Sequence, residues 1–320
     1  MNLTTTFSIP TAPVSMNHRS RVLTMGSCFA ASMGSRLSKL PLEVMTQPWG
    51  TLFHPFAITR ALSGEVSEDL YEHGGYFLHP DYHSIFTATS SADLLEDIRS
   101  VAHEASTFAA SSDFLILTWG TSFSYFDKHL NKSVANCHKM PADRFEKRLS
   151  TVDDIVRDFS SLLSSLPSTT QVVLTVSPVR HTKDGMMENQ VSKSTLRVAA
   201  DIVSKQFENV HYFPAYEIML DELRDYRFYE ADMIHPNEQA QDYIWERFMA
   251  TYFDQELQTI VKKWDSIYRT LAHRPHPAKL IDHRRVLEVL LAELNTEKYQ
   301  EIDTCKIAEY VAHEIKNTYI

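Results

Sequence analysis

The sequence predicts an α/β fold with a mainly parallel sheet that helices cover on both faces. Short apolar runs alternate with longer stretches in which apolar residues recur every three or four positions. The runs are continuously apolar, which is typical of strands buried on both faces. Small or polar residues follow each run directly, at the sheet edge where open α/β folds bind their ligands.

The N-terminal third begins with a strand, a tight turn and a helix. The strand is expected at 21–25 and ends at Gly26, and apolar residues then show helical spacing over about 28–40. A second short strand is expected at 42–45, followed by a helix at 55–62 that begins at a proline. The sequence thus alternates from its first elements onward.

The middle of the chain continues the alternation after an interruption. Residues 71–89 are rich in Tyr, Phe, His, Gly and Pro, which favours an irregular insertion or a hairpin. The remaining elements are expected to be strands at 114–119, 172–176 and 211–213, and helices at 143–163, 190–207 and 238–252. No repeat at a fixed period is present, which disfavours solenoids and propellers.

After about residue 254 the pattern changes to long helical stretches with a basic, proline-broken joint at 273–277. We therefore divide the chain into a catalytic domain, 1–254, and a helical C-terminal appendage, 255–320. We expect this appendage to serve packing or self-association of the chain into a homo-oligomer.

Composition narrows the class of function. The net charge of −10 argues against a broad nucleic-acid-binding surface, which needs clustered Lys and Arg. The N-terminus lacks the pattern of a secretory signal, and no apolar run of about 18 residues follows, so we expect a cytoplasmic protein without a membrane span. Three dispersed cysteines are too few for a disulfide framework, so reactivity is the better reason for one of them to matter.

Gly26-Ser27-Cys28 lies where the first strand turns into the first helix. Backbone N–H groups and the helix dipole at such a turn favour negative charge. A nucleophile there gains from a lowered thiol pKa and from amides that can hold the oxyanion of a tetrahedral intermediate. The simpler interpretation is a helix-capping Ser27 beside a buried Cys28.

Asp232 and His235 lie just before the last expected helix of the catalytic domain. Their three-residue offset allows the carboxylate to bind one imidazole nitrogen, which leaves the other free to take a proton from a nucleophile. An ordinary pair of capping or surface residues would show the same spacing.

Other polar groups were weighed as sites. Cys28, Cys137, His138, Asp232 and His235 could be considered for a metal, but no pair has the spacing of a zinc motif, so no metal and no cofactor is expected.

Arg180 and His181 follow a core strand, where they could bind a substrate carboxylate or phosphate. A structural ion pair is an equal alternative for them.

A nucleophile after the first strand and an Asp-x-x-His after the last fit one recurring arrangement. The sequence resembles the GSCFA family of the SGNH/GDSL hydrolase superfamily, over roughly 20–255. The motifs that carry the resemblance are Gly26-Ser27-Cys28-Phe29-Ala30, Pro48-x-Gly50-Thr51-x-Phe53-x-Pro55, Asn136-Cys137-His138-Lys139, Ser177-Pro178-Val179-Arg180-His181 and Asp232-x-x-His235. The resemblance implies a three-layer, flavodoxin-like fold.

The resemblance also implies roles for individual residues. Asp232 and His235 correspond to the orienting acid and the base, and Gly50 to a backbone oxyanion donor. The superfamily's first block is Gly-Asp-Ser, and alignment on the strand and glycine puts Cys28 at the nucleophile position and makes Ser27 a turn residue.

The superfamily's asparagine block corresponds to Gly120-Thr121-Ser122, which ends in serine. Because Ser122 is a poorer donor than asparagine, Asn136 or backbone amides are expected to assist at the oxyanion.

The expected function is hydrolysis of acyl esters or thioesters through an acyl-enzyme on Cys28 or Ser27 that His235 activates. The substrate is expected to be a small-molecule or carbohydrate acyl ester, with carbohydrate O-acetyl groups suggested by family analogy alone. The alternatives are an O-acyltransferase, in which a hydroxyl replaces water, and a noncatalytic binding protein that retains the fold.

Overall fold

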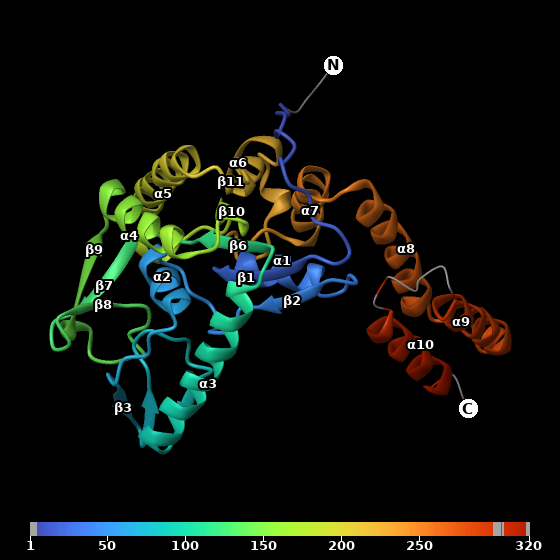
Figure 1. Cartoon of the computed structure of the whole chain (residues 1–320), viewed down its shortest axis with the longest axis horizontal. Helices are drawn as coiled ribbons and strands as arrows, with labels where there is room; N and C mark the ends of the chain where they lie inside the picture. Colours follow the sequence, from blue (N-terminus) through green and yellow to red (C-terminus); the bar gives the residue numbers. More distant parts are fainter. Residues whose placement is uncertain (1–4, 297–301, 303, 318–320) are drawn as a thin grey trace.

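The computed structural model describes residues 5–296, 302 and 304–317. Residues 1–4, at the expected signal-free N-terminus, and 297–301, 303 and 318–320, in the expected appendage, lie outside the described part of the chain. At the centre is a five-stranded parallel sheet with the order β11-β10-β6-β1-β2 (Figure 1). Its strands are β1 (Arg21–Gly26), β2 (Glu43–Thr46), β6 (Phe114–Trp119), β10 (Gln171–Val176) and β11 (Val210–Tyr212).

This order confirms the α/β prediction and locates the ligand-binding edge. Counted along the chain, the parallel strands are arranged second, first, third, fourth, fifth, as in flavodoxin-like sheets. The connections change direction between β1 and β6, and the crevice beyond the carboxyl ends of these two strands is the usual binding site. Gly26 pairs with Thr118 at this point.

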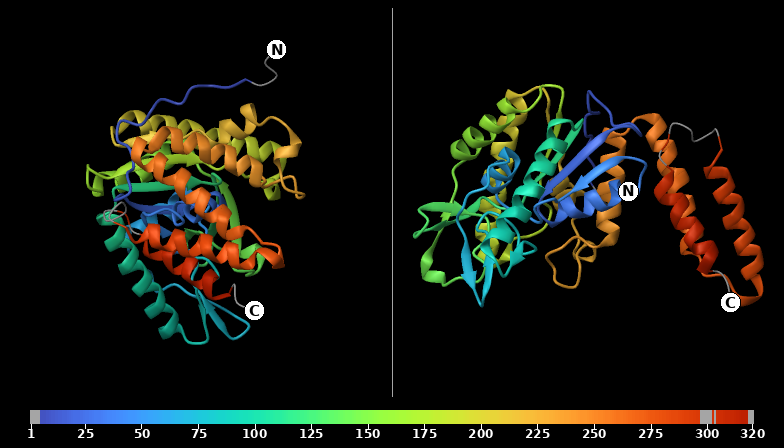
Figure 2. Two further views of the ribbon diagram at one scale, coloured as in Figure 1. Left: turned by 90° about the vertical axis from the view of Figure 1, so that its right-hand side faces the viewer. Right: turned by 60° about the horizontal axis from the view of Figure 1, so that its bottom comes forward.

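Helices cover both faces of the sheet, giving three layers (Figure 2). Successive strand residues point to opposite faces, so Val22 packs into one hydrophobic cluster and Leu23 into the other. The first cluster includes side chains of α1 (Cys28–Leu37) and α7 (Glu238–Tyr252). The second includes side chains of α2 (Pro55–Ser63), α3 (Ser91–Ala110), α4 (Val152–Ser165) and α5 (Met186–Gln206).

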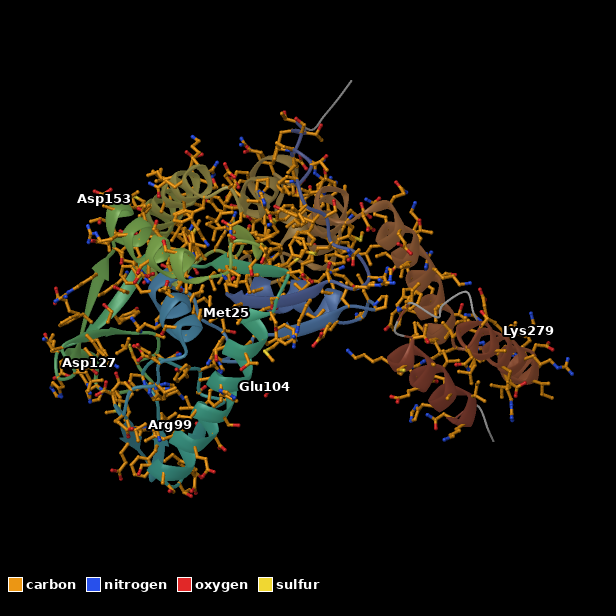
Figure 3. The ribbon with its side chains drawn as sticks, in the orientation of Figure 1. Met25, Arg99, Glu104, Asp127, Asp153 and Lys279 are labelled. Carbon is orange, nitrogen blue, oxygen red and sulfur yellow. The ribbon has the colours of Figure 1, made fainter. Side chains whose placement is uncertain are left out.

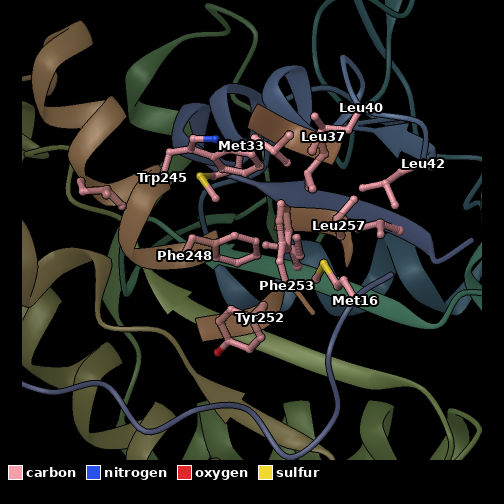
Figure 4. Close-up of a cluster of buried hydrophobic side chains, with 14 of the residues drawn as sticks. Met16, Met33, Leu37, Leu40, Leu42, Trp245, Phe248, Tyr252, Phe253 and Leu257 are labelled. Carbon is pink, nitrogen blue, oxygen red and sulfur yellow. The ribbon is translucent and has the colours of Figure 1, made fainter. Parts of the chain in front are cut away.

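The first cluster joins α1 to α7 beneath the turn that carries Cys28. Met33 and Leu37 of α1 lie near Trp245 and Phe248 of α7, and Met16 reaches the same cluster from the N-terminal segment (Figure 4). All five side chains are buried. The two helices are therefore held in a fixed relation at the edge of the sheet.

Two small antiparallel sheets interrupt the alternation. One contains β3 (Tyr71–His73), β4 (Tyr76–Leu78) and β5 (Thr87–Ala88), and the other β7 (Phe123–Asp127), β8 (Lys132–Val134) and β9 (Phe145–Leu149). The first confirms the hairpin expected at 71–89. The second lies away from the parallel sheet, where Figure 3 labels Asp127.

The helix expected at 143–163 was wrong in its first part. Residues 145–149 form β9, which pairs antiparallel with β7, Phe145 opposite Asp127 and Leu149 opposite Phe123. Helix α4 begins only at Val152, after the capping Thr151. Apolar residues four apart in this segment fit a helix as well as an edge strand. Pairing with β7 decided between them.

The C-terminal helices are α8 (Gln255–Ala272), α9 (Leu280–Leu294) and α10 (Cys305–Asn317), which extend away from the sheet (Figures 1 and 2). Leu257 and Trp264 of α8 belong to the same hydrophobic cluster as α1 and α7. The remaining short turns are η1 (Ala142–Arg144), η2 (Thr182–Asp184), α6 (Ala215–Glu217), η3 (Ile218–Glu222), η4 (Tyr226–Phe228) and η5 (Pro277–Lys279). The division at residue 254 stays a prediction, because the apolar core crosses it.

Within the described ranges, none of the helices combines the length and apolar character that a bilayer crossing requires.

Candidate functional site

The turn after β1 is built around a glycine that no other residue could replace without strain. Gly26 has φ +131°, and a Cβ there would lie 2.1 Å from the carbonyl oxygen of Thr118. Ser27 then donates its N–H to the same carbonyl and begins α1 as its N-cap, its Oγ accepting from the N–H of Phe29 at 3.3 Å. Ser27 is 1% exposed. This residue serves the turn.

Cys28 is the first residue of α1 and is half-buried, whereas Ser27 is buried. Burial raises the pKa of this thiol. The N–H groups of Cys28 and Phe29 and the charge of Lys193 act in the opposite direction, because they stabilise the thiolate. The same two amides could meet an oxyanion formed beside the sulfur.

Gln47 fastens this turn from the end of β2. Its Oε1 accepts from the N–H of Gly26, and its Nε2 donates to the carbonyls of Gly26 and Ser27 at 3.1 and 2.9 Å. Gln47 itself has φ +48°, an uncommon conformation for a residue with a side chain. The backbone that presents Cys28 is therefore held on both sides.

Asp232 and His235 form the expected pair. The Nδ1 of His235 lies 2.7 Å from Oδ2 of Asp232, and Oδ1 accepts from the N–H groups of Ile234 and His235. These hydrogen bonds lower the pKa of Asp232 to about 2, and the bond from the His235 ring has the largest effect. Since the carboxylate can only accept, it fixes the proton of the imidazole on Nδ1 and leaves Nε2 for exchange with a substrate.

The loop that carries this pair is braced from the end of β10. Arg180 donates its N–H to the carbonyl of Ile234 and its Nη1 to that of Met233 at 3.1 Å. Its guanidinium lies over the ring of Tyr229, 4.0 Å from the centroid. Arg180, which the sequence suggested as a substrate-binding residue, is thus placed to hold the loop.

Contacts between α1 and α7 bring this loop to the face of α1 that includes Cys28. Cys28, Ser32 and Arg36 are spaced four apart and share one face. On that face, Ser32 donates to Gln241, and Arg36 forms an ion pair with Asp242 at 2.6 Å, both on the first turns of α7.

His235 lies only three residues before α7 begins. No hydrogen bond links His235 to Cys28 directly among the residues that the structure describes. The contacts between α1 and α7 are what bring the two groups into the same part of the molecule.

The model of the GSCFA family matches residues 21–248, from the first residue of β1 into the last turns of α7. The chain belongs to the GSCFA family. The matched segment includes every candidate site residue and ends before α8. No match was found among curated proteins.

The oxyanion donors expected from the sequence of this GSCFA chain are engaged within the protein. The N–H of Gly50 donates to Gln47, that of Gly120 to Phe53, and that of Ser122 to Oγ of Ser192 at 2.8 Å.

Asn136 donates its Nδ2 to the carbonyl of Tyr82 at 2.9 Å. The oxyanion role of Gly50, Gly120, Ser122 and Asn136 stays a prediction that requires these bonds to open. The amide of Phe29 is also engaged, since it donates to Oγ of Ser27, and it too would have to turn from that partner toward an oxyanion.

His181 lies close to the centre of the site. Its ring packs edge-on against Phe53, with centroids 5.2 Å apart, and its N–H donates to Asn189. Burial, followed by the nearby charge of Lys193, lowers its pKa. A neutral His181 forms part of the wall of the site and is not paired with Arg180.

Two residues of the site were missed from the sequence. Lys193 shares a helical face with Leu196, Ala200 and Val203, so its position on a buried face could have been recognised by periodicity. Gln47 had no such signal, because it precedes a turn in which many residue types would serve.

Of the residues considered for a metal, Cys137 is half-buried, and His138 donates from Nε2 to the carbonyl of His79. No group of three or more His, Cys, Asp or Glu side chains within the described ranges is placed to hold a metal ion.

Proposed function

We propose that this GSCFA protein is an acyl-transfer enzyme of the SGNH type, which forms an acyl-enzyme on Cys28 and passes the acyl group to water or to a hydroxyl. Carbohydrate O-acetyl esters and acyl thioesters are the proposed substrate classes. The observation that carries the proposal is the Asp232–His235 pair, held by α7 on the same side of α1 as the half-buried thiol.

The geometry supports Cys28 over Ser27 as the nucleophile. Ser27 is buried and its hydroxyl caps α1, whereas the sulfur of Cys28 lies beside two backbone amides at a helix N-terminus. In the proposed first step the sulfur attacks the acyl carbon, an S–C bond forms, and the bond to the leaving alcohol or thiol breaks. The S–H proton passes to a base of the site, and His235, protonated on both nitrogens at the start of this step, supplies from Nε2 the proton that the leaving group needs.

In the second step His235 takes a proton from the incoming water or hydroxyl, which attacks the thioester carbon. The S–C bond breaks, and Cys28 is regenerated. Asp232 keeps the imidazole in the same tautomer in both steps and stays ionised, since its pKa of about 2 is far below neutral pH.

Kinetics of the full chain with acetyl and short-chain acyl esters and thioesters test the proposal. Cys28→Ala should abolish turnover, and His235→Ala and Asp232→Asn should each lower kcat by between about 10²- and 10⁴-fold. Intact-mass measurement should find an acyl adduct on the wild-type chain but none on Cys28→Ala.

Matched controls are Cys137→Ala and His103→Ala, because Cys137 has a thiol pKa raised by burial to about 11 and His103 is exposed on α3. Both should keep wild-type kinetics. The enzyme proposal fails if no substrate is turned over, or if His235→Ala turns substrates over as fast as the wild type. An adduct that passes only to an added hydroxyl acceptor would identify a transferase.

A further inference from the structure

Lys193 is a buried amine at the centre of the ligand-binding edge. It lies on α5 and is 1% exposed. Its Nζ donates to the carbonyls of Gly120 and Ser177 at 2.7 and 2.8 Å. Gly120 is the first residue after β6, and Ser177 is the first residue after β10. Because the carboxyl end of β1 is adjacent to that of β6, this places the amine beside the turn that presents Cys28.

Two hydrogen bonds fix the position of Nζ. An amine has two N–H groups and one lone pair, whereas an ammonium has three N–H groups. The structure gives Nζ two acceptors within the described residues, both of them carbonyls. The remaining position on the nitrogen, a lone pair in the amine and a third N–H in the ammonium, is directed away from these two carbonyls.

The surroundings of Lys193 favour the neutral form. The groups that face it are the thiol of Cys28, the ring of His181 and the ring of Tyr216, whose centroid is 5.8 Å from Nζ. None of the three is a carboxylate. A buried ammonium is costly, and burial lowers the pKa of Lys193 to about 7, while the negative charge of a Cys28 thiolate acts in the opposite direction.

We propose that Lys193, and not His235, takes the proton of Cys28. The inference rests on the proposed function for the identity of the nucleophile. As sulfur attacks the acyl carbon, the S–H bond breaks and a third N–H bond forms on Nζ. The ammonium returns this proton to sulfur when the S–C bond breaks in the second step. No further reactant is needed.

The two proton carriers then have separate tasks. Lys193 serves the nucleophile from within the sheet edge, and half-exposed His235 serves the leaving group and the incoming acceptor from the solvent side. Neither Lys193 nor His235 is hydrogen-bonded to Cys28 in the described part of the chain, and what distinguishes the amine is its burial at the sheet edge beside the turn. This division gives a function to a lysine whose burial is otherwise a cost to the fold.

Alkylation of Cys28 by iodoacetamide, followed by intact mass between pH 6 and 10, tests the proposal. Exposed Cys305 is replaced by serine in every variant so that its alkylation does not interfere. Lys193→Met should slow alkylation at pH 7.5 by at least about tenfold and move the profile to higher pH, because the thiol loses the amine that takes its proton and the thiolate loses the ammonium that then stabilises it. His235→Ala should alkylate within about twofold of the wild type while losing turnover.

Lys205→Met is the matched control, since Lys205 lies on the same helix, is exposed and pairs with Asp201 at 2.7 Å. Its alkylation profile should equal that of the wild type. The inference is overturned if folded Lys193→Met shows the wild-type profile, or if His235→Ala shifts it.

A measurement on the wild-type chain covers the case in which Lys193→Met does not fold. With ¹³C-labelled lysine, the Cε resonance of one lysine should titrate near pH 7 and disappear from the spectrum of Lys193→Met or Lys193→Gln, whichever folds. Titration of every lysine above about pH 9 overturns the inference. A shifted alkylation profile without turnover would refute the proposed function alone, and turnover without a shift would refute the inference alone.

Discussion

Ser27 and Cys28 are neighbours with different roles because α1 begins between them. Ser27 has φ −70° and ψ 174°, so it lies outside the helix and directs its hydroxyl back to the first free N–H groups. Cys28 already has helical geometry, and its side chain emerges at the surface of α1. One residue along the chain thus separates a capping group from a nucleophile.

Lys193 should give the stability of the protein a distinctive pH dependence. Its folded pKa of about 7 is below the ordinary 10.5, so between these values the unfolded chain binds a proton that the folded chain does not. The free energy of unfolding of the wild type should therefore rise with pH relative to that of Lys193→Met, by at most about 1.4 kcal/mol per pH unit. Urea denaturation at pH 7, 8.5 and 10 measures the difference.

Lys205→Met provides the comparison for this slope, because its amine is exposed. The difference between wild type and Lys205→Met should stay flat over the same range. An equally flat difference for Lys193→Met would mean that Lys193 titrates as an ordinary lysine.

Site residues whose roles depend on near neighbours in the sequence were predicted, and those whose roles depend on contacts between distant elements were not. Gly26 and the Asp232–His235 spacing are local patterns, and the sequence identified both. Lys193 acts across 165 residues on Cys28, and Gln47 acts on a turn in another element, so neither role is visible before the sheet is assembled. The hydrogen bonds that engage Gly50 are equally a product of packing.

At the scale of elements, the hydrogen bonds of Gln47, which link the end of β2 to the turn after β1, can be tested by mutation. Gln47→Ala removes three hydrogen bonds to the backbone of Gly26 and Ser27. At about 1 kcal/mol each, the loss should lower the free energy of unfolding by about 2–3 kcal/mol. It should also slow alkylation of Cys28, because the turn no longer holds the sulfur beside its amides.

Urea denaturation and the alkylation rate measure these effects, and Gln255→Ala serves as the control because Gln255 is exposed at the start of α8. A stable Gln47→Ala chain with wild-type alkylation would show that the glycine turn keeps its shape without the hydrogen bonds of Gln47.

Most elements were predicted from the sequence because apolar pattern and local signals agreed. The strand at 114–119 and the helix at 238–252 match β6 and α7 residue for residue. The failure at 145–149 arose where a charged edge strand and a helix have similar patterns. The conformation of such a segment depends on its partner strand, here β7, and the apolar pattern of the segment carries no information about that partner.

At the scale of the molecule, the C-terminal helices share a core with the sheet, so we expect them to unfold together. Trp264 of α8 is 2% exposed within the cluster that contains α1 and α7. Trp264→Ala should cost about 3–5 kcal/mol and move one common transition. Far-UV circular dichroism and protection of Cys28 from alkylation should follow the same urea curve.

Val289→Ala on α9 is the matched control, because this side chain is 68% exposed, and it should leave the midpoint unchanged. Two separate transitions, with Trp264→Ala affecting only the first, would instead make the helices an independent domain and support the division at residue 254.

The distance in sequence between Cys28 and Lys193 has a consequence for the nascent chain. Lys193 follows Cys28 by 165 residues, so at 5–20 residues per second the amine is synthesised about ten to thirty seconds after the thiol. During that interval Cys28 has the reactivity of an ordinary cysteine. The chemistry proposed for the mature protein would therefore be latent on the ribosome and would begin only when α5 docks.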